Sequence, residues 1–155
     1  MEFDRADEKF MRQAIELAQE SEQAGEVPVG AVVVVGGEVV GYGSNFPIRD
    51  IDPTAHAEMK AIREAARRVE NYRLPGSTLY CTLEPCAMCA GAIVLARVER
   101  LVFAARDLRF GAVRSKFALV DSPLLNHQVR VQEGLLAAEA GKLLTEFFGR
   151  TRARG

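Results

Sequence analysis

One histidine and two cysteines stand at a spacing that suits a metal ion. His56 is followed two residues later by Glu58, and farther along the chain Cys86 and Cys89 form a C-x-x-C pair. Zinc prefers four tetrahedral ligands drawn from cysteine sulfur and histidine nitrogen, and a catalytic site leaves one of these positions to water. Three protein ligands with a carboxylate beside them therefore predict a metal-activated water and hydrolytic chemistry.

Other uses of these residues fit the pattern less well. A closed structural zinc site would have to recruit Cys81, since the chain holds only three cysteines and two histidines. Cys81 alternates with Leu79 and Leu83 on one face of a predicted strand, and we expect it in the core. A redox C-x-x-C pair should follow a thioredoxin-type strand and has no need of the preceding H-x-E. His127 has no partner pattern and is expected in a loop or at the surface.

The composition is that of an ordinary soluble globular protein, with 48% hydrophobic and 26% charged residues. The length predicts a single domain over residues 1–155 that buries about two-thirds of its unfolded surface. The longest apolar run, Gly30–Val35, is too short to span a bilayer, and residues 1–5 carry no apolar signal core. We therefore expect a cytoplasmic protein with no membrane segment. In that reducing compartment the C-x-x-C pair is better suited to a metal than to a disulfide.

Charge excludes a protein that is electropositive all over, because the net charge is −1 and the pI is about 6.2. Local basic patches are nevertheless present. The segment 97–116 has six basic residues against two acidic ones, and 150–154 holds three arginines. Such patches supply the affinity that nucleic acid requires, but a solvated face and a terminus produce the same pattern. Charge alone therefore leaves the substrate open.

Hydrophobic periodicity predicts helices that alternate with strands. Met11, Ile15 and Ala18 share one stripe of the first helix, and β-branched apolar runs bounded by turn residues indicate the strands. The predicted helices are 7–24, 53–69, 86–96 and 134–148, and the predicted strands are 29–35, 38–43, 78–83, 100–104 and a short piece at 129–131. This order predicts an α/β protein, a three-layer α/β/α sandwich around a central mixed five-stranded sheet.

Both halves of the metal motif fall at predicted helix starts. Asp52-Pro53 is typical of an N-cap followed by the first helical residue, which places His56 just inside one helix, and Cys86 opens the next. The partial positive charge of a helix N-terminus favours the thiolate that binds metal. Cys86 and Cys89 are three residues apart on that helix, so both sulfur atoms can face one point.

Glu58 is expected to lie outside the ligand set. His56 and Glu58 are two residues apart, and two steps of a helix turn by about 200°, so the two side chains do not share a face. Two thiolates also neutralise the ion already, and a third anionic ligand would weaken its action on water. We therefore expect Glu58 to be the general base that acts on the water.

The H-x-E…P-C-x-x-C arrangement is the signature of the zinc-dependent nucleobase deaminases. Within that superfamily the chain resembles the bacterial tRNA-specific adenosine deaminases along nearly its whole length from Glu26 to Phe148. The segments that carry the resemblance are Glu26-Val27-Pro28-Val29-Gly30-Ala31, Asn45, Asp52-Pro53-Thr54-Ala55-His56-Ala57-Glu58, Asn71-Tyr72-Arg73-Leu74, Thr78-Leu79-Tyr80, Thr82-Leu83-Glu84-Pro85-Cys86-Ala87-Met88-Cys89-Ala90-Gly91-Ala92, Ala105-Arg106-Asp107, Asn126-His127 and Phe147-Phe148.

The resemblance implies a cytidine deaminase-like fold and a reaction. One zinc ion per subunit would be held by His56, Cys86 and Cys89. Glu58 would take a proton from the zinc-bound water, the hydroxide would attack C6 of adenine, and Glu58 would return protons to the ring nitrogen and to the departing ammonia. The substrate implied is the wobble adenosine of a tRNA anticodon, flipped out of its loop, and the product is inosine.

The resemblance also implies contacts to the RNA. Asn45 would contact the base, and Val27 and Pro28 would line its pocket. Asn126 and the region of Phe148 would hold flanking anticodon nucleotides. The family is homodimeric, so we expect a homodimer in which both protomers contribute to the RNA surface.

Two other functions remain open at this point. The same zinc site serves deaminases of a free nucleobase or nucleoside, such as guanine, cytosine or cytidine, and the near-neutral net charge is compatible with such a substrate. A non-catalytic zinc module that only binds RNA is the other alternative. That module would have no need of Glu58, which argues against it.

Overall fold

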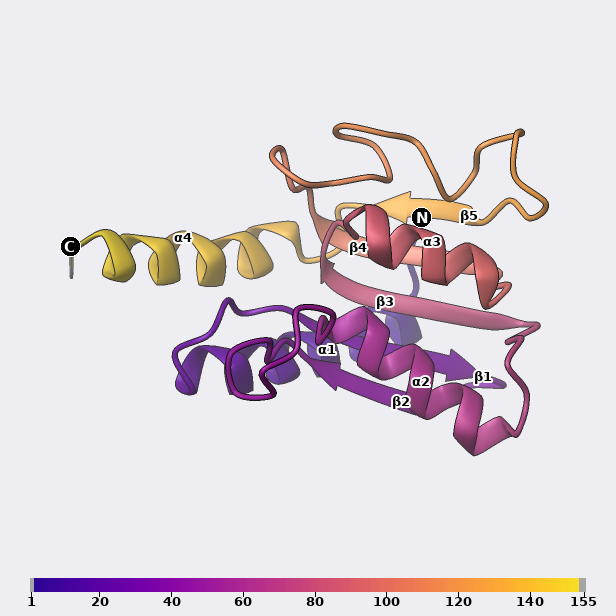
Figure 1. The fold of residues 1–155 in the computed structure, drawn as a ribbon, viewed down its shortest axis with the longest axis horizontal. Coiled ribbons are helices and arrows are strands. Elements are labelled where there is room, and N and C mark those ends of the chain that lie inside the picture. Colours follow the sequence, from indigo (N-terminus) through magenta and orange to yellow (C-terminus); the bar gives the residue numbers. More distant parts are fainter. Residues whose placement is uncertain (1, 154–155) are drawn as a thin grey trace.

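A five-stranded sheet runs through the middle of the molecule (Figure 1). The computed structural model describes residues 2–153. Their helices are α1 (Arg5–Gln23), α2 (Ala57–Val69), α3 (Ala87–Leu95) and α4 (Ala137–Ala153), and their strands are β1 (Gly30–Val35), β2 (Glu38–Ser44), β3 (Ser77–Leu83), β4 (Arg100–Ala105) and β5 (Arg130–Glu133). In the sheet order β2-β1-β3-β4-β5, β1 is antiparallel to both neighbours, whereas β3, β4 and β5 are parallel. The predicted α/β class and mixed sheet are confirmed.

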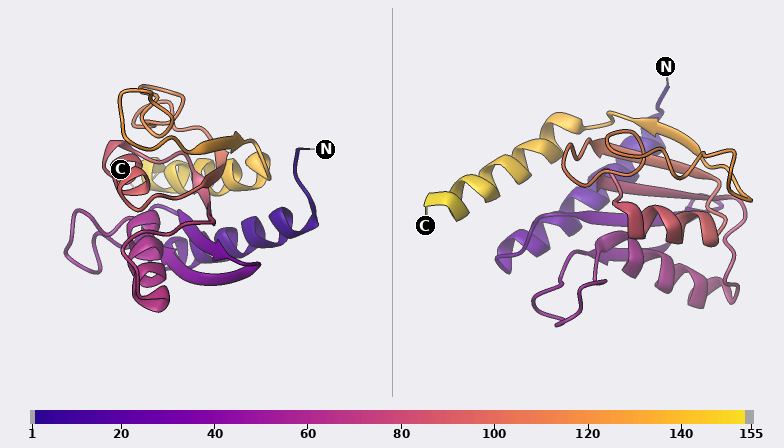
Figure 2. Two further views of the ribbon diagram at one scale, coloured as in Figure 1. Left: turned by 90° about the vertical axis from the view of Figure 1, so that its right-hand side faces the viewer. Right: turned by 45° about the horizontal axis from the view of Figure 1, so that its top comes forward.

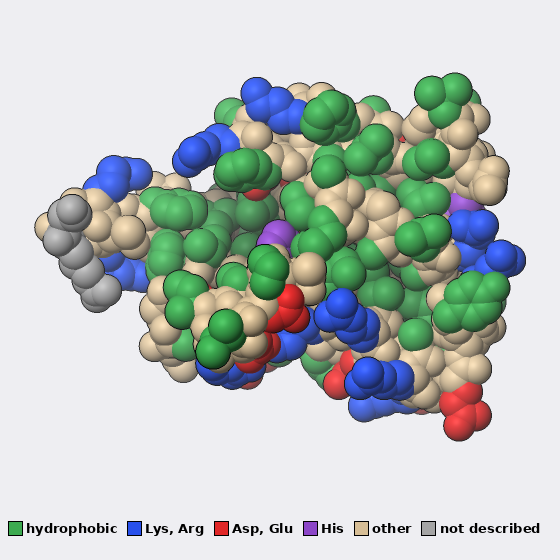
Figure 3. Space-filling view, in the orientation of Figure 1, with side chains coloured by type: hydrophobic (Ala, Val, Ile, Leu, Met, Phe, Trp, Pro, Cys, Tyr) green, Lys and Arg blue, Asp and Glu red, His purple; other side chains and the backbone are tan. Residues whose placement is uncertain are grey.

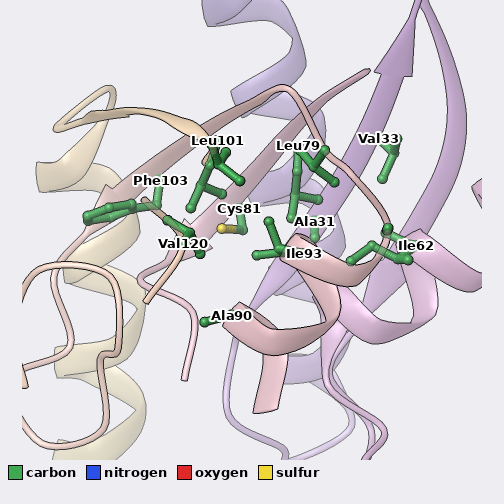
Figure 4. Packing of buried hydrophobic residues seen from close by; sticks show 14 of the residues in the cluster. Ala31, Val33, Ile62, Leu79, Cys81, Ala90, Ile93, Leu101, Phe103 and Val120 are labelled. Atoms are coloured by element: carbon green, nitrogen blue, oxygen red, sulfur yellow. The ribbon is translucent and has the colours of Figure 1, made fainter. Parts of the chain in front are cut away.

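The helices cover both faces of this sheet, as Figure 2 shows. Successive side chains of a strand point to opposite faces, so β1 serves both layers. Ala31 and Val33 pack in the core beneath α2 and α3, and Val32 and Val34 pack in a second core beneath α1 and α4. Figure 4 shows the first core, in which Cys81 is fully buried between β-strand and helix side chains. The prediction that Cys81 is a core residue is confirmed.

Two glycines let α2 lie directly on β2. A Cβ atom at Gly43 would overlap the carbonyl oxygen of Ala57, and one at Gly41 would overlap the carbonyl oxygen of Ala61. Only glycine allows two backbones to approach so closely. Because α2 begins beside Gly43, this contact sets the position of the first turn of the helix above the sheet.

The start of α2 differs from the sequence prediction. The helix begins at Ala57, and His56 is its N-cap in extended backbone, with φ −78° and ψ 150°. Asp52 does not cap it, because its Oδ1 accepts hydrogen bonds from the Thr54 amide and hydroxyl, both at 2.8 Å. An aspartate that bonds to the backbone two residues on makes a turn of its own, which competes with helix capping. Pro53 therefore belongs to a turn.

The last helix is displaced toward the C-terminus relative to the prediction. It begins at Ala137, after a turn in which Gly134 has a φ of 101°, and it continues through Gly149 to Ala153. In Figure 1 its C-terminal half extends beyond the rest of the molecule. Arg154 of the basic tail lies outside the described residues. No helix among residues 2–153 has the length and apolar character needed to cross a membrane.

A buried ion pair joins α1 to the sheet. Arg100 donates to the two carboxylate oxygens of Asp7 at 2.8 and 3.0 Å, and the Tyr80 hydroxyl donates to the same carboxylate at 2.6 Å. The hydrogen bonds from Arg100 are the main reason that the pKa of Asp7 falls to about 2 from its ordinary 3.8. Asp7 also accepts from the Asp4 amide, which completes the capping box of α1.

We expect Asp7→Asn to lower the free energy of unfolding by about 2–4 kcal/mol at pH 7, because it leaves Arg100 buried without a counter-charge. The folded-state pKa lies below the ordinary value, so the stabilisation is complete above about pH 5 and is lost as the pH falls toward 2. Urea unfolding at several pH values should show the gap between wild type and variant narrowing below pH 4. A gap that stays constant with pH would contradict this assignment. Glu139→Gln is the matched control, since the Arg12–Glu139 pair is half exposed and a surface pair of this kind contributes little to stability.

Candidate active site

Three potential metal ligands converge where α2 and α3 begin. The Nδ1 atom of His56 lies 3.6 Å from the Sγ atom of Cys86 and 3.5 Å from that of Cys89. The ligand atoms of the three residues all lie within 4.8 Å of one another. His56 is the N-cap of α2 and Cys86 the N-cap of α3, so two helix N-termini point at the same place. One nitrogen and two sulfur donors at this separation fit a tetrahedral zinc ion with one ligand position left over.

Hydrogen bonds within this group determine its protonation. Bonds from Cys89 and His56 lower the pKa of the Cys86 thiol to about 4. The contact with Cys86 and burial raise the pKa of the Cys89 thiol. The bond to Cys86 also raises the pKa of His56. Zinc requires thiolates and a neutral imidazole, so metal binding displaces these protons.

Glu58 lies in the first turn of α2, beside the ligand group and outside it. Its residue is 4% exposed, and burial raises the pKa of its carboxyl group. A carboxyl group whose pKa is raised holds a proton more readily than an ordinary one, which suits a group that must both take up a proton and release it. The offset from His56 arises because His56 has extended backbone, while Glu58 is helical.

A pocket of about 850 Å³ opens in front of Glu58. That volume is in the range that holds a small-molecule ligand. Figure 3 shows the hollow, bordered by hydrophobic side chains, between α4 and the body of the molecule. The lining residues are Val27, Val29, Asn45, Pro47, His56, Glu58, Leu83, Glu84, Cys86, Arg106, Asp107, Leu108, Arg109, Phe110, Leu144, Phe148 and Arg152.

Comparison with known proteins decides the family. Residues 4–105 match the cytidine and deoxycytidylate deaminase zinc-binding region. A tRNA-specific adenosine deaminase of Haemophilus influenzae is 50% identical over 147 residues, which are 94% of this chain and 85% of that protein. This chain belongs to the tRNA-specific adenosine deaminase family. The deaminase is accordingly a hydrolytic enzyme of the zinc-dependent superfamily.

Two solved structures place the deaminase within its superfamily. One comes from a study of A-to-I editing by tRNA:A34 deaminases at the wobble position; it has a TM-score of 0.83 and 42% identity and covers 88% of this chain and 99% of that one. The other is the guanine deaminase of Nitrosomonas europaea, with a TM-score of 0.79 and 28% identity, covering 90% of this chain and 83% of that one. Both support the predicted cytidine deaminase-like fold.

Most of the other site residues expected from the sequence also line the pocket of the deaminase. Val27 and Asn45 lie side by side, because the Asn45 side-chain amide donates to the Val27 carbonyl oxygen at 3.2 Å. Phe148 lies on the far side, on α4, and is 42% exposed. Pro28 is buried next to Val27 and is not among the lining residues.

Asn126 lies away from the pocket. It is exposed in the segment that precedes β5, and the Nε2 atom of its neighbour His127 lies 2.7 Å from the carbonyl oxygen of Val98. Val98 comes just before β4, whereas the pocket residue Arg106 comes just after it. Asn126 is therefore at the opposite end of β4, and its contact with a flanking nucleotide stays a prediction.

Sequence reasoning gave no site role to several lining residues of the deaminase. Leu144 and Arg152 flank Phe148 at intervals of four residues, so the three share one face of α4, and this spacing is visible in the sequence. The segment 106–110 supplies a whole wall of the pocket. It has no periodicity, and only its first two residues belong to the family resemblance.

Proposed function

We propose that this protein deaminates adenosine to inosine at the wobble position of a tRNA anticodon. The main observation behind this proposal is that Glu58 lies beside His56, Cys86 and Cys89 in one pocket. Residues of α4 and of the segment 106–110, which contains two arginines, also line that pocket. The names of the relatives and the structure from the tRNA:A34 deaminase study support the choice of substrate. We further propose that residues 1–155 form one deaminase domain that acts in the cytoplasm, where its substrate is found.

We propose one zinc ion per subunit, held by His56, Cys86 and Cys89. When bound, zinc makes water acidic enough to act as a nucleophile near neutral pH. Glu58 has the position for the proton transfers that hydrolysis needs. Its carboxylate would accept one proton of the attacking water and deliver it to the N1 atom of the adenine ring. It would then take the second proton, from the hydroxyl group now attached to C6, and pass it to the amino group, which departs as ammonia. Burial of Glu58 supports this role, because it holds the carboxyl pKa above its ordinary value.

The base would enter the pocket singly. A deaminase cannot reach the C6 amino group of a stacked base, so the nucleotide has to be turned out of the anticodon loop. Val27 and Val29, which line the pocket, would supply apolar contacts for the ring, and the Asn45 side chain, held by the Val27 carbonyl oxygen, would contact its edge. Pro28 would act through the rigidity that it gives to the segment between these two valines.

The rim would hold the flanking nucleotides. Phe148 offers an aromatic face for stacking, and Arg109 and Arg152, which line the same pocket, would meet phosphates. Arg106 also lines the pocket, but its guanidinium group is bonded to Glu133 at 2.7 and 3.0 Å. A local basic rim reconciles RNA binding with a net charge of −1. Asn126 could reach the same RNA only from another position, for example from a second protomer.

We expect Phe148→Ala to raise the KM for an anticodon stem-loop by about tenfold and to change kcat much less. Stacking of one base on an aromatic side chain is worth about 1–3 kcal/mol, and it is present in both the ground state and the transition state. Steady-state kinetics with the stem-loop measure both constants. Tyr42→Ala is the control, because Tyr42 is an aromatic residue of β2 that is 44% exposed but does not line the pocket. Equal effects of the two substitutions would exclude a specific role for Phe148.

We also propose a homodimer. Large apolar side chains remain exposed away from the pocket, among them Tyr72, Leu95 at the end of α3, and Phe117. In the view of Figure 3, apolar side chains are spread over much of the visible surface. Apolar surface of this kind is typical of an interface. Analytical ultracentrifugation at several concentrations tests the proposal, and a monomer at every concentration would refute it.

An anticodon stem-loop assay tests the substrate. The purified protein is incubated with a stem-loop that carries adenosine at the wobble position, and in parallel with free adenosine, guanine, cytosine and cytidine. We expect inosine in the stem-loop and no conversion of the free compounds. Guanine is the most informative alternative, since the similar Nitrosomonas europaea structure is a guanine deaminase. Conversion of free compounds alone would refute the tRNA substrate while leaving the deaminase chemistry in place.

A further inference from the structure

A second buried glutamate lies next to the site and takes no part in the ligand group. Glu84 follows β3 and is 2% exposed. Its carboxylate accepts hydrogen bonds from the segment 106–115, which we call the wall loop. The Oε1 atom accepts from the Asp107 amide at 3.1 Å and the Ser115 hydroxyl at 2.5 Å, and the Oε2 atom accepts from the amides of Val113, Arg114 and Ser115 at 3.0, 2.7 and 2.9 Å.

These bonds hold the wall loop at both ends. The Asp107 amide lies at its start, and the other donors lie at its end, so one carboxylate closes the loop. Three consecutive amides that point at one oxygen form a concave anion site in the backbone. Leu108 and Phe110 at the tip are 73% and 64% exposed, so packing of these side chains does not fix the tip. Within the tip, Asp107 Oδ1 accepts from the amides of Arg109 and Phe110 at 3.0 and 3.1 Å. The bonds to Glu84, together with the Ala112 amide that donates to the Pro85 carbonyl oxygen at 2.8 Å, attach this turn to the rest of the protein.

A glycine lets the loop pass close to this carboxylate. A Cβ atom at Gly111 would overlap the carboxyl carbon and Oε1 of Glu84 as well as the carbonyl oxygen of Asp107. The Gly111 amide donates to that same carbonyl oxygen at 2.9 Å, which closes the turn at the tip. Residues 106–110 on the outside of this turn form one wall of the pocket.

We propose that Glu84 is a positioning residue that fixes the wall loop and thereby the affinity of the pocket for its nucleotide. It differs from Glu58 in its partners. Every donor around the Glu84 carboxylate is a backbone amide or a hydroxyl of the wall loop, so this carboxylate serves the loop, whereas Glu58 faces the metal ligands. The expected consequence is a role in KM with little role in kcat. The identity of the nucleotide rests on the proposed function, but the effect on the loop does not.

Glu84→Gln is the most specific test, because the partners of the two carboxylate oxygens show which single hydrogen bond the substitution removes. The carboxamide oxygen at the Oε2 position still accepts from the three consecutive amides. The NH₂ group at the Oε1 position can donate to the Ser115 hydroxyl but offers no acceptor to the Asp107 amide. The loop is then released at Asp107, on the side of the pocket, and stays attached at its other end. Glu84→Ala would strand four backbone amides, so it is a poorer test.

Three measurements on Glu84→Gln test the proposal. Amide hydrogen exchange of residues 107–111 should become at least about tenfold faster, while exchange in α2 stays unchanged. The KM for the anticodon stem-loop should rise about tenfold, as expected for the loss of one hydrogen bond to a charged group, with kcat within about threefold of wild type. Zinc content should equal that of wild type. Glu38→Gln, at an exposed glutamate of β2, is the matched control and should change none of these values.

Gly111→Ala tests the same contact from the loop side. Its methyl group would push the loop away from Glu84, so it should reproduce the faster exchange and the higher KM. Zinc content is measured on this variant as well, because the neighbouring Ala112 amide donates to the carbonyl oxygen of Pro85, next to Cys86. The double variant should be no worse than the stronger single variant, since both remove one interaction.

Several outcomes would overturn the proposal. Unchanged exchange at 107–111 in Glu84→Gln would show that the loop does not depend on the carboxylate. A loss of zinc, or a fall in kcat at constant KM, would show that Glu84 acts through Cys86 instead. If the wild-type protein converts a free base and not the stem-loop, the proposed tRNA substrate is wrong, but the role of Glu84 can still be tested. Amide hydrogen exchange at residues 107–111 and the KM for that free base are then the measurements that decide it.

Discussion

Glu58→Gln is expected to reduce inosine formation by at least about 10³-fold while the protein keeps its zinc. Glutamine has nearly the same volume and fits the same buried place, but it cannot accept or return a proton. Every proton transfer assigned to Glu58 is lost together, so kcat should fall and KM should change little. His56, Cys86 and Cys89 remain intact, and metal content is therefore expected to be unchanged.

The measurement combines single-turnover kinetics on the stem-loop with metal analysis of the same preparation. Glu16→Gln, at an exposed glutamate of α1, is the control and should retain full activity and full zinc. Activity of Glu58→Gln within about tenfold of wild type would contradict the role of Glu58 as proton carrier. If every measurable function survived, the chain would instead be a zinc module that binds RNA without catalysis.

Cys86→Ala is expected to abolish both metal binding and activity. Removal of one of three protein ligands leaves a site with too few donors for zinc, and the chemistry that zinc supplies is lost with it. The loss should also destabilise the fold locally, because the ligand group joins the start of α2 to the start of α3. We therefore expect less than about a tenth of the wild-type zinc and an activity loss of at least about 10³-fold.

The buried cysteine Cys81 provides the control for this experiment. Cys81→Ala removes a thiol that is buried in the core and stands outside the ligand group, so it should lower thermal stability slightly and leave zinc content unchanged. A chelator should reproduce the effect of Cys86→Ala on wild type, and added zinc should reverse the chelator but not the substitution. Full zinc in Cys86→Ala, or rescue of that variant by added zinc, would contradict the ligand assignment.

Much of the fold is predictable from the sequence, because burial has a regular pattern there. The apolar β-branched run of β1 predicts a central strand with both faces covered, and its alternate side chains do enter two different cores. The helix starts are less predictable. Asp52 and Pro53 carry the types of a helix start, but the Asp52 side chain bonds to Thr54 first, and the helix begins four residues later than predicted.

The candidate site also has a part that the sequence predicts and a part that it does not. Zinc chemistry demands particular residue types at particular spacings, and this pattern singles out His56, Glu58, Cys86 and Cys89 in the sequence. The sequence does not predict the wall loop. Glu84 holds this loop mainly through backbone amides, and every residue except proline has such an amide. The extension of α4 past Phe148 is also not predicted, for another reason. Glycine disfavours a helix by about 1 kcal/mol, so the prediction ends the helix before Gly149, whereas the observed helix continues to Ala153.

Because α2 contacts β2 through backbone atoms at Gly41 and Gly43, the position of the site does not depend on which side chains fill the core. No side chain lies between the two backbones at Gly41 and Gly43, so the height of His56 and Glu58 above the sheet is set by the van der Waals radii of backbone atoms. Apolar substitutions elsewhere in the core can change stability and leave this height unchanged. A single methyl group at Gly43 would overlap the Ala57 carbonyl oxygen, so it would displace the proposed zinc ligand and the proposed proton carrier together.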